Sequence, residues 1–290
     1  MAISLSSIKR TKHENPPRIV IFGPEKVGKS TFFAGGHVNG QHQGSAPSPI
    51  FIRTEDGLNG LDVDAFPLAE TYQQVREALA ALAQEKHDYK TVVVDSADWL
   101  ERLIHQFTIE SCQATVRGTK TMETAHGGYG KAYTVALTHW REVLSALDYL
   151  NKSRGMVVGV ICHSTVITVN DPFLPEPIDK WETKLHKPSK GTGARDLLSE
   201  WADVIGFAQR ETFVSRKDTA DGKQVARAAA PIGVSNKLHL VGGPGVMAGN
   251  RYSIPAVIDL SWQAFSDALS AALNASSPQQ PTTNKPAKAA

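Results

Sequence analysis

The stretch GPEKVGKST, residues 23–31, has the glycines, lysine and hydroxyl groups of a phosphate-binding loop. Its spacing matches the P-loop pattern, and the apolar run 19–22 directly precedes it. In such a loop, backbone N–H groups and a helix N-terminus bind phosphate oxygens, Lys29 adds positive charge and Ser30 can ligate Mg²⁺. The alternative is a chance match in a glycine-rich turn, which the strand-loop-helix context disfavours. The predicted nucleotide-binding residues are Gly23, Pro24, Glu25, Lys26, Val27, Gly28, Lys29, Ser30 and Thr31.

A second group for the metal is expected where the apolar run 91–95, TVVVD, ends in an aspartate. P-loop NTPases hold Mg²⁺ with the hydroxyl of the loop and with an acidic residue of this kind. Ser30 and Asp95 are therefore the predicted metal ligands, and Lys29 and Asp95 belong to the predicted catalytic set. The alternative is that Asp95 only caps the helix expected to begin near Ala97, because aspartate is a favoured N-cap residue.

Two further polar residues follow apolar runs. Glu55 comes after the run 50–52, and His163 ends the run 155–162. Because parallel strands bring their C-terminal ends to one edge of a sheet, both side chains are expected beside the phosphate loop. Glu55 is the candidate for activating the hydrolytic water, with Asp56 as a competitor and a solvated turn carboxylate as the alternative. His163 is the candidate sensor of the γ-phosphate, or else simply a histidine at a strand end.

Glu25 is unusual in a loop that binds anions. A carboxylate facing the phosphates would weaken their binding by like-charge repulsion, so the side chain of Glu25 is expected to point outward. We therefore predict that Glu25→Ala leaves nucleotide binding intact and weakens assembly or the response to DNA.

Strands and helices must alternate to position these residues. Four short apolar runs are expected to be strands buried on both faces, and two longer segments repeat apolar residues at helical spacing. The runs are residues 19–22, 50–52, 91–95 and 155–162, and the helices are 71–85 and 133–150. This order predicts an α/β fold with a central, mostly parallel sheet flanked by helices.

Beyond residue 165 the alternation of apolar runs and helical segments is less regular. Residues 171–196 are expected to be a long loop that could hold a hairpin, and three later segments are expected to be antiparallel strands at one sheet edge. These segments are 201–207, 212–217 and 237–241. The predicted domains are an N-terminal arm, residues 1–16, an ATPase core, residues 17–273, and a disordered tail, residues 274–290.

Composition limits the function classes. The 290 residues carry a formal net charge of +2, too small to indicate a nucleic-acid-binding protein without local basic clusters. Cys112 and Cys162 are far apart in sequence, which fits a reducing compartment and two small buried side chains. The longest strongly apolar run, residues 155–162, is far shorter than a membrane span of about 20 residues. We therefore predict a cytoplasmic protein without membrane association.

Four segments in this order resemble the core of RecA-type recombinases: GPEKVGKST, FIRTEDGL, VVVDSADWL and VICHS. The segments 129–133, 197–208 and 249–255 are further similar to the small phage-encoded RecA-like ATPases that act as single-strand annealing proteins. The resemblance covers about residues 17–262. It implies a RecA-like P-loop NTPase core with ATP and Mg²⁺ as cofactors, and the host cytoplasm as the location if the protein is phage-encoded.

The resemblance also implies roles for single residues. Lys29 and Ser30 would bind phosphate and Mg²⁺, Asp95 would hold the metal through water, Glu55 would activate the hydrolytic water and His163 would sense the γ-phosphate. Bacterial RecA usually has a glutamine at the sensor position, so this chain departs from the pattern there. RecA-like ATPases bind DNA through loops after the third and fourth strands, which correspond here to residues 117–131 and 165–195.

The composition of these two loops is compatible with that role. Basic side chains spaced among glycines, with Tyr129 and Trp181 between them, suit a single-stranded backbone with stacked bases. The alternative is that they are ordinary solvated loops. The predicted DNA-binding residues are Arg117, Lys120, Lys131, Lys180, Lys184, Lys187, Lys190 and Arg195.

RecA-like enzymes bind ATP between adjacent subunits, so the resemblance implies a homo-oligomer, a ring or filament, and a basic residue acting in trans. Arg251 is the candidate, with Lys237 as the second choice and an ordinary surface role as the alternative. The predicted function is ATP-dependent annealing of complementary strands, with single-stranded DNA as partner and a single-strand-binding protein as a further candidate. The alternatives are a RecA-like motor, helicase or loader, and a nucleotide switch whose hydrolysis is too slow to matter.

Overall fold

The computed structural model describes residues 4, 8, 15–38, 41–112, 120–211, 213–218, 224–229 and 236–275. Its centre is a mixed sheet whose main path runs β14-β12-β9-β1-β7-β6-β4-β5. Six of these strands run parallel: β1 (Arg18–Gly23), β4 (Pro49–Arg53), β5 (Asp64–Ala65), β6 (Thr91–Asp95), β7 (Val157–Val169) and β9 (Val204–Gln209). Beyond β9, antiparallel pairing extends the sheet: β12 (Lys237–His239) and β13 (Gly249–Asn250) pair with β9, and β14 (Val257–Asp259) pairs with β12.

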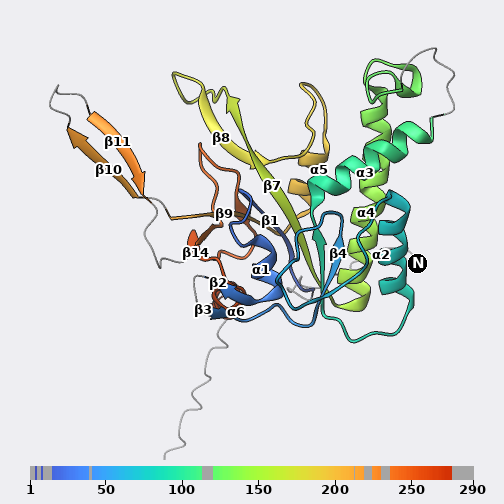
Figure 1. Cartoon of the computed structure of the whole chain (residues 1–290), viewed down its shortest axis with the longest axis horizontal. Coiled ribbons are helices and arrows are strands. Elements are labelled where there is room, and N and C mark those ends of the chain that lie inside the picture. Colours follow the sequence, from blue (N-terminus) through green and yellow to red (C-terminus); the bar gives the residue numbers. More distant parts are fainter. Residues whose placement is uncertain are drawn as a thin grey trace, which may run out of the picture.

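Helices cover both faces of the sheet (Figure 1). One face carries α2 (Tyr72–Gln84), α3 (Ala97–Glu110), α4 (Lys131–Arg154) and α5 (Ala194–Trp201), and the other carries α1 (Lys29–Ala34) and α6 (Trp262–Ala275). A short 3₁₀-helix, Ala125–Gly127, precedes α4. Successive residues of β1 alternate between the two cores: Val20 and Phe22 pack on the α2–α5 side, and Ile19 and Ile21 on the α1–α6 side. This two-sided burial is why the strand reads as a continuous apolar run.

The strand register lines up the ends of four parallel strands. Gly23 of β1 pairs with His163 of β7, and Asp95 of β6 lies between Arg53 of β4 and Ile161 of β7. The residues that follow or end these strands therefore meet at one edge of the sheet. This edge carries the candidate site.

Strand β7 continues beyond this edge and pairs with β8 (Ile178–Thr183) as an antiparallel hairpin that projects from the body. The segment expected to be a long loop is therefore built around a hairpin, followed by the helix α5. The hairpin places its two strands directly above the edge at which β7 carries His163.

Most elements expected from the sequence are present. The four apolar runs are parallel strands, and the helices expected over 71–85 and 133–150 are α2 and α4. The Thr71 hydroxyl and the Gln74 side chain form a capping box that begins α2. Cys112 and Cys162 are buried, as expected.

Two expectations of the sequence differ from the structure. Residues 201–207 divide between the end of α5 and the parallel strand β9, and the segment 212–217 is wrong as a sheet-edge strand. Among the described strands, its strand β10 (Phe213–Asp218) pairs with β11 (Gln224–Ala229) alone, in a separate two-stranded ribbon. The glycine-rich segment after the phosphate loop contains a small hairpin of β2 (Gly36–Val38) and β3 (Gln41–Gln43). Most of the predicted arm, and residues 276–290 of the predicted tail, lie outside the described residues.

Candidate functional site

The phosphate loop connects β1 to α1 and is shaped by left-handed backbone at two positions. Lys26 has φ 58° and Gly28, the N-cap of α1, has φ 104°. A glycine adopts the conformation of residue 28 without strain, whereas a larger residue would not. The side chain of Lys29 folds back so that Nζ donates to the carbonyls of Gly23 (3.0 Å) and Pro24 (2.8 Å). The lysine ammonium is thus fixed inside the loop.

Burial changes the electrostatics of Lys29. The residue is 6% exposed, and desolvation lowers its pKa, opposed by the carboxylates of Asp95 and Glu55. A buried positive charge in a loop of backbone N–H groups is a strong attractor for anions.

Two side chains, one directly after β9 and one directly before β12, hold the outside of the loop. Asn236 Nδ2 donates to the carbonyl of Val27 (2.6 Å), and Arg210 Nη2 donates to that of Lys26 (3.1 Å). These bonds occupy carbonyl oxygens of the loop that would repel phosphate if they turned inward. Sequence reasoning missed both residues, because they lie about 180 to 210 positions from their partners.

Ser30 and Asp95 meet as the metal prediction requires. Ser30 Oγ donates to Asp95 Oδ2 at 2.7 Å, and Asp95 is 3% exposed. Burial raises the pKa of Asp95, while the Ser30 hydroxyl and the Lys29 ammonium oppose the rise. A hydroxyl and a carboxylate in contact beside a phosphate loop are oxygen donors of the kind Mg²⁺ accepts. These two residues would hold a magnesium ion, which would add positive charge beside the bound phosphates.

Glu55 lies at the same edge and is held by its backbone. The Thr54 hydroxyl donates to the carbonyl of Ser96 (2.7 Å) and accepts from its N–H (2.8 Å), which locks the end of β4 to the end of β6. Burial raises the pKa of Glu55, and the nearby His163 opposes that rise. A carboxylate with a raised pKa is a better proton acceptor than an exposed one. Asp56, the competing candidate, is instead bound by the guanidinium of Arg53 at 2.6 Å.

His163 stands between Glu55 and a residue that sequence reasoning missed, Asp98. Its Nδ1 lies 3.0 Å from Asp98 Oδ2, and its Nε2 lies 4.0 Å from Glu55 Oε1. The hydrogen bond to Asp98 raises the pKa of His163, and Glu55 acts in the same direction while Lys29 opposes. Asp98 is in the first turn of α3, where an acidic residue is common for reasons of the helix dipole alone, so the sequence carried no distinct signal.

Glu25 is exposed, and the outward orientation of its side chain stays a prediction. A bond from its own backbone N–H lowers its pKa, and His163, Lys29 and Lys184 act in the same direction. The carboxylate therefore lies within electrostatic reach of the sensor candidate and of the segment after β8.

The predicted DNA-binding residues separate into different environments. Arg195 is wrong as a DNA contact: it is 8% exposed, and its guanidinium binds Glu182 Oε2 (2.7 Å) and the carbonyl of Leu185 (3.1 Å). Lys180 and Lys187 form ion pairs with Glu182 (3.2 Å) and Asp196 (3.0 Å).

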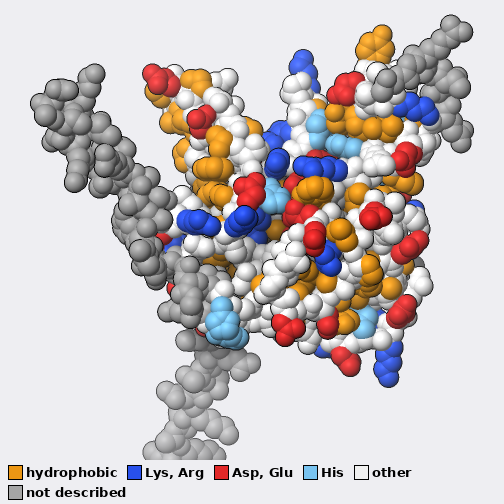
Figure 2. Space-filling view, viewed as in Figure 1, with side chains coloured by type: hydrophobic (Ala, Val, Ile, Leu, Met, Phe, Trp, Pro, Cys, Tyr) orange, Lys and Arg blue, Asp and Glu red, His pale blue; other side chains and the backbone are white. Residues whose placement is uncertain are grey.

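Most of the remaining predicted basic residues are exposed to solvent. Lys120, Lys131, Lys184 and Lys190 are exposed, although Nζ of Lys120 also donates to the carbonyl of Cys112. Arg117 lies outside the described residues. Figure 2 shows Lys, Arg and His side chains gathered in the hollow between the β7–β8 hairpin and the helical side of the molecule.

Aromatic side chains lie beside these lysines. The rings of Tyr133 and His186 are stacked at 4.0 Å and 8°, and Tyr129 is 98% exposed. They line a hollow of about 630 Å³ together with Lys190. Trp181 stacks instead on Phe207 and is only partly exposed. The two segments predicted to bind DNA therefore meet at this hollow, which joins the start of α4 to the loop before α5.

The two candidates for a residue acting in trans are both engaged within the chain. Arg251 binds Asp203 at 3.0 Å, and it lies where β13 pairs with the start of β9, the opposite end of the sheet from the phosphate loop. Lys237 binds Asp259 at 2.7 Å and lies next to Asn236, on the same side as the loop. A trans role for either residue stays a prediction.

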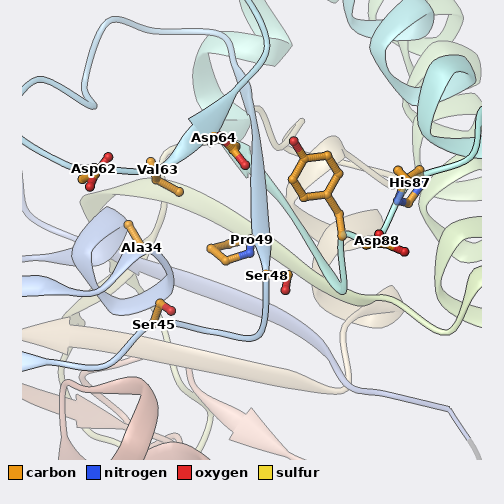
Figure 3. Close-up of a pocket in the computed structure, with 10 residues that line it drawn as sticks. Ala34, Ser45, Ser48, Pro49, Asp62, Val63, Asp64, His87 and Asp88 are labelled. Carbon is orange, nitrogen blue, oxygen red and sulfur yellow. The ribbon is translucent and has the colours of Figure 1, made fainter.

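A polar hollow of about 700 Å³ lies at the opposite end of the sheet, where β4 and β6 begin (Figure 3). Asp62, Asp64 and Asp88 line it together with His87. Its described lining has no lysine or arginine that could neutralise a phosphate, so it is not assigned to the nucleotide.

The strand order, the phosphate loop and the Ser30–Asp95 pair define a P-loop ATPase core of RecA-like fold. A family model described as an AAA domain matches residues 15–252, and the chain belongs to this family. Among solved structures, the chain is similar to the crystal structure of the RadB recombinase, with 14% sequence identity and a TM-score of 0.38. That match covers 77% of this chain and 87% of the other. No curated protein matches the chain.

None of the helices in the described ranges combines the length and apolar character that crossing a bilayer requires.

Proposed function

We propose that the protein is an ATP-dependent, single-stranded-DNA-binding recombination protein that promotes annealing of complementary strands. The observation that carries this proposal is a direct connection between the candidate ATP site and the segment that leads to the basic, aromatic surface. The carbonyl of His163 accepts from the N–H of Lys184 at 2.8 Å, so the sensor candidate and the start of the basic segment are bonded neighbours.

At the nucleotide site, the loop 23–31 would bind the phosphates and Lys29 would neutralise their charge. Ser30 and Asp95 would hold Mg²⁺, which supplies further charge stabilisation when bound. Glu55 would accept a proton from a water molecule that attacks the terminal phosphate. Phosphoryl transfer depends mostly on such positioning and electrostatic stabilisation, which this edge of the sheet provides.

At the DNA surface, Lys184 and Lys190 would bind the phosphate backbone, and Lys120 and Lys131 are further candidates from the other segment. Tyr129 would stack on an unpaired base, and its almost fully exposed ring beside the basic residues supports this role. Basic side chains alternating with accessible rings favour single strands, whose bases are free to stack. Binding through backbone and stacking is insensitive to sequence, as annealing requires.

A second candidate is a RecA-like motor, helicase or loader that acts on DNA or on a protein partner. Directional strand displacement without annealing activity would select it over the annealing protein. Subunit contacts are part of both proposals, with Arg251 or Lys237 as the residue that a neighbouring subunit would supply.

The test measures binding of a fluorescent oligo-dT to the purified full chain over a range of salt concentrations, with a non-hydrolysable ATP analogue. Lys184→Gln and Lys190→Gln are compared with Lys152→Gln, which removes an exposed lysine at the far end of α4. Each lost phosphate contact is expected to lower the slope of log K against log salt by about 0.7, and the control is expected to leave it unchanged.

Annealing of complementary oligonucleotides is then followed with and without ATP, using Lys29→Ala as the nucleotide-site variant. Salt-sensitive binding with annealing supports the proposal. Absence of single-strand binding by the wild-type protein would refute it.

A further inference from the structure

Asp98 binds His163 through both its backbone and its ring. Asp98 Oδ1 accepts from the backbone N–H of His163 at 3.0 Å, and the carboxylate oxygens lie 3.1 and 3.0 Å from Nδ1. The Asp98 side chain is 5% exposed, so water competes little for these bonds. A carboxylate that accepts from Nδ1 fixes the plane of the imidazole and leaves only Nε2 for other partners.

The remaining ring nitrogen faces the reaction centre. Nε2 of His163 lies 4.0 Å from Oε1 of Glu55, the candidate that activates water. This distance is too long for a hydrogen bond and suits an electrostatic contact that a small movement would close. The ring is therefore held between a buried carboxylate on α3 and a partly buried one after β4.

The charges around the ring come from several elements. Asp98 on α3, Glu55 after β4, Asp95 on β6 and Glu25 in the phosphate loop are acidic, and Lys29 at the start of α1 is basic. The pKa of His163 is raised, chiefly by Asp98, and the same contact lowers the pKa of Asp98 against the effect of its burial. The acidic surroundings favour an imidazolium, which offers a donor at Nε2.

We propose that Asp98 is a positioning residue, which orients His163 so that Nε2 is presented to Glu55 and to the terminal phosphate of the nucleotide. This inference rests on the proposed nucleotide site, because the role of His163 belongs to it. A glutamine at the sensor position offers a neutral amide, whereas this chain offers a ring whose orientation depends on a second residue.

The orientation also reaches the DNA surface. The backbone N–H of His163 donates to Asp98 and its carbonyl accepts from the N–H of Lys184, so a shift of His163 would reach both α3 and the segment after β8. Asp98 would thus set the resting position from which nucleotide binding displaces the sensor.

The most direct test is ¹⁵N NMR of the histidine rings in the nucleotide-free full chain, with His163 assigned by comparison with His163→Gln. Free histidine can carry its single proton on either nitrogen, and the bond at one nitrogen decides the tautomer. Above the titration of the ring, Nδ1 of His163 is expected to keep its proton. A neutral ring protonated at Nε2 in the wild-type protein would overturn the proposal without any variant of Asp98.

Asp98→Asn is the matched substitution, because the amide oxygen can still accept the backbone N–H while the NH₂ group donates to Nδ1. The proton of the neutral ring is then expected to move to Nε2. Glu101→Gln, one turn further along α3, has no bond to His163 and is expected to leave the ring signals unchanged. An unchanged tautomer in Asp98→Asn would overturn the proposal.

Kinetics separate positioning from a purely structural role. Residues that orient a functional histidine are typically worth about 10- to 100-fold in activity, so kcat of Asp98→Asn is expected to fall by that factor with little change in KM for ATP. In the His163→Gln background the same substitution should have little further effect, because the two residues act as one unit. If Asp98→Asn lowered kcat by the same factor in the His163→Gln background as in the wild type, the proposal would be contradicted. If the wild-type protein hydrolyses no ATP, the proposed function fails, and the tautomer still decides the role of Asp98.

Discussion

Glu101 provides a quantitative prediction about stability. It lies on α3, is 7% exposed and accepts the N–H of His186 through Oε2 at 2.9 Å. Burial raises the pKa of Glu101 from 4.5 to about 7, and Asp98 adds to the rise, while His186, Trp140 and Arg195 oppose it. Glu101 therefore holds the loop before α5, and burying its ionised carboxylate lowers the stability of the fold.

The sign follows from proton linkage. An acid whose pKa is higher in the folded state than in the unfolded state stabilises the fold below the unfolded pKa, and this contribution is lost as pH rises through the folded pKa. The difference between 4.5 and about 7 corresponds to about 3 kcal/mol of unfolding free energy. Glu101→Gln keeps an uncharged acceptor for the N–H of His186. The variant therefore does not lose stability through ionisation of this side chain as the pH rises.

The assay is urea unfolding of both proteins at pH 5 and pH 8. At pH 5 the variant and the wild type are expected to have similar unfolding free energies. At pH 8 the variant is expected to be more stable than the wild type by up to about 3 kcal/mol. Glu110→Gln at the exposed end of the same helix is the control and should follow the wild type. A difference that is the same at both pH values, or a variant destabilised at pH 8, would refute the reasoning.

Three further substitutions test other contacts. Arg195→Leu leaves the buried Glu182 with Lys180 as its remaining partner. It is expected to cost up to about 3–5 kcal/mol of unfolding free energy in urea titrations, a loss that a surface DNA contact would not produce. A Cβ at position 159 would lie 2.7 Å from the ring of Phe33, so Gly159→Ala should lower stability by about 1–3 kcal/mol, and Phe33→Leu should recover part of that in the double variant. Glu25→Ala should bind a fluorescent ATP analogue as the wild type does and weaken assembly or DNA stimulation, and lost nucleotide affinity would contradict this expectation.

The sequence predicted those parts of the molecule that depend on local pattern. Strands buried on both faces are short apolar runs, and the residues after them must meet because parallel strands end at one edge. This is why Asp95, Glu55 and His163 were placed beside the phosphate loop correctly. The short hairpins and the division of residues 201–207 between α5 and β9 depend on pairing that periodicity does not contain.

Other features depend on partners that are distant in sequence. Arg195 is a basic residue in a basic, glycine-containing segment, which is the local pattern expected of a DNA contact. Only the fold shows that Glu182 of β8 pairs with it inside the protein. Asp98 looks like any acidic residue in a first helical turn until β7 brings His163 to it. Arg210 and Asn236 show no local sign that they hold the phosphate loop.

The central claim is that the edge formed by the phosphate loop, Glu55, Asp95 and His163 hydrolyses ATP in response to single-stranded DNA. The most direct measurement is the steady-state rate of Mg²⁺-dependent ATP hydrolysis by wild type and Glu55→Gln during titration with single-stranded DNA. The wild-type rate is expected to rise with DNA, and Glu55→Gln should bind the nucleotide but hydrolyse it at least about 100-fold more slowly. A wild-type rate that does not respond to DNA, or a Glu55→Gln rate equal to that of the wild type, would contradict the account.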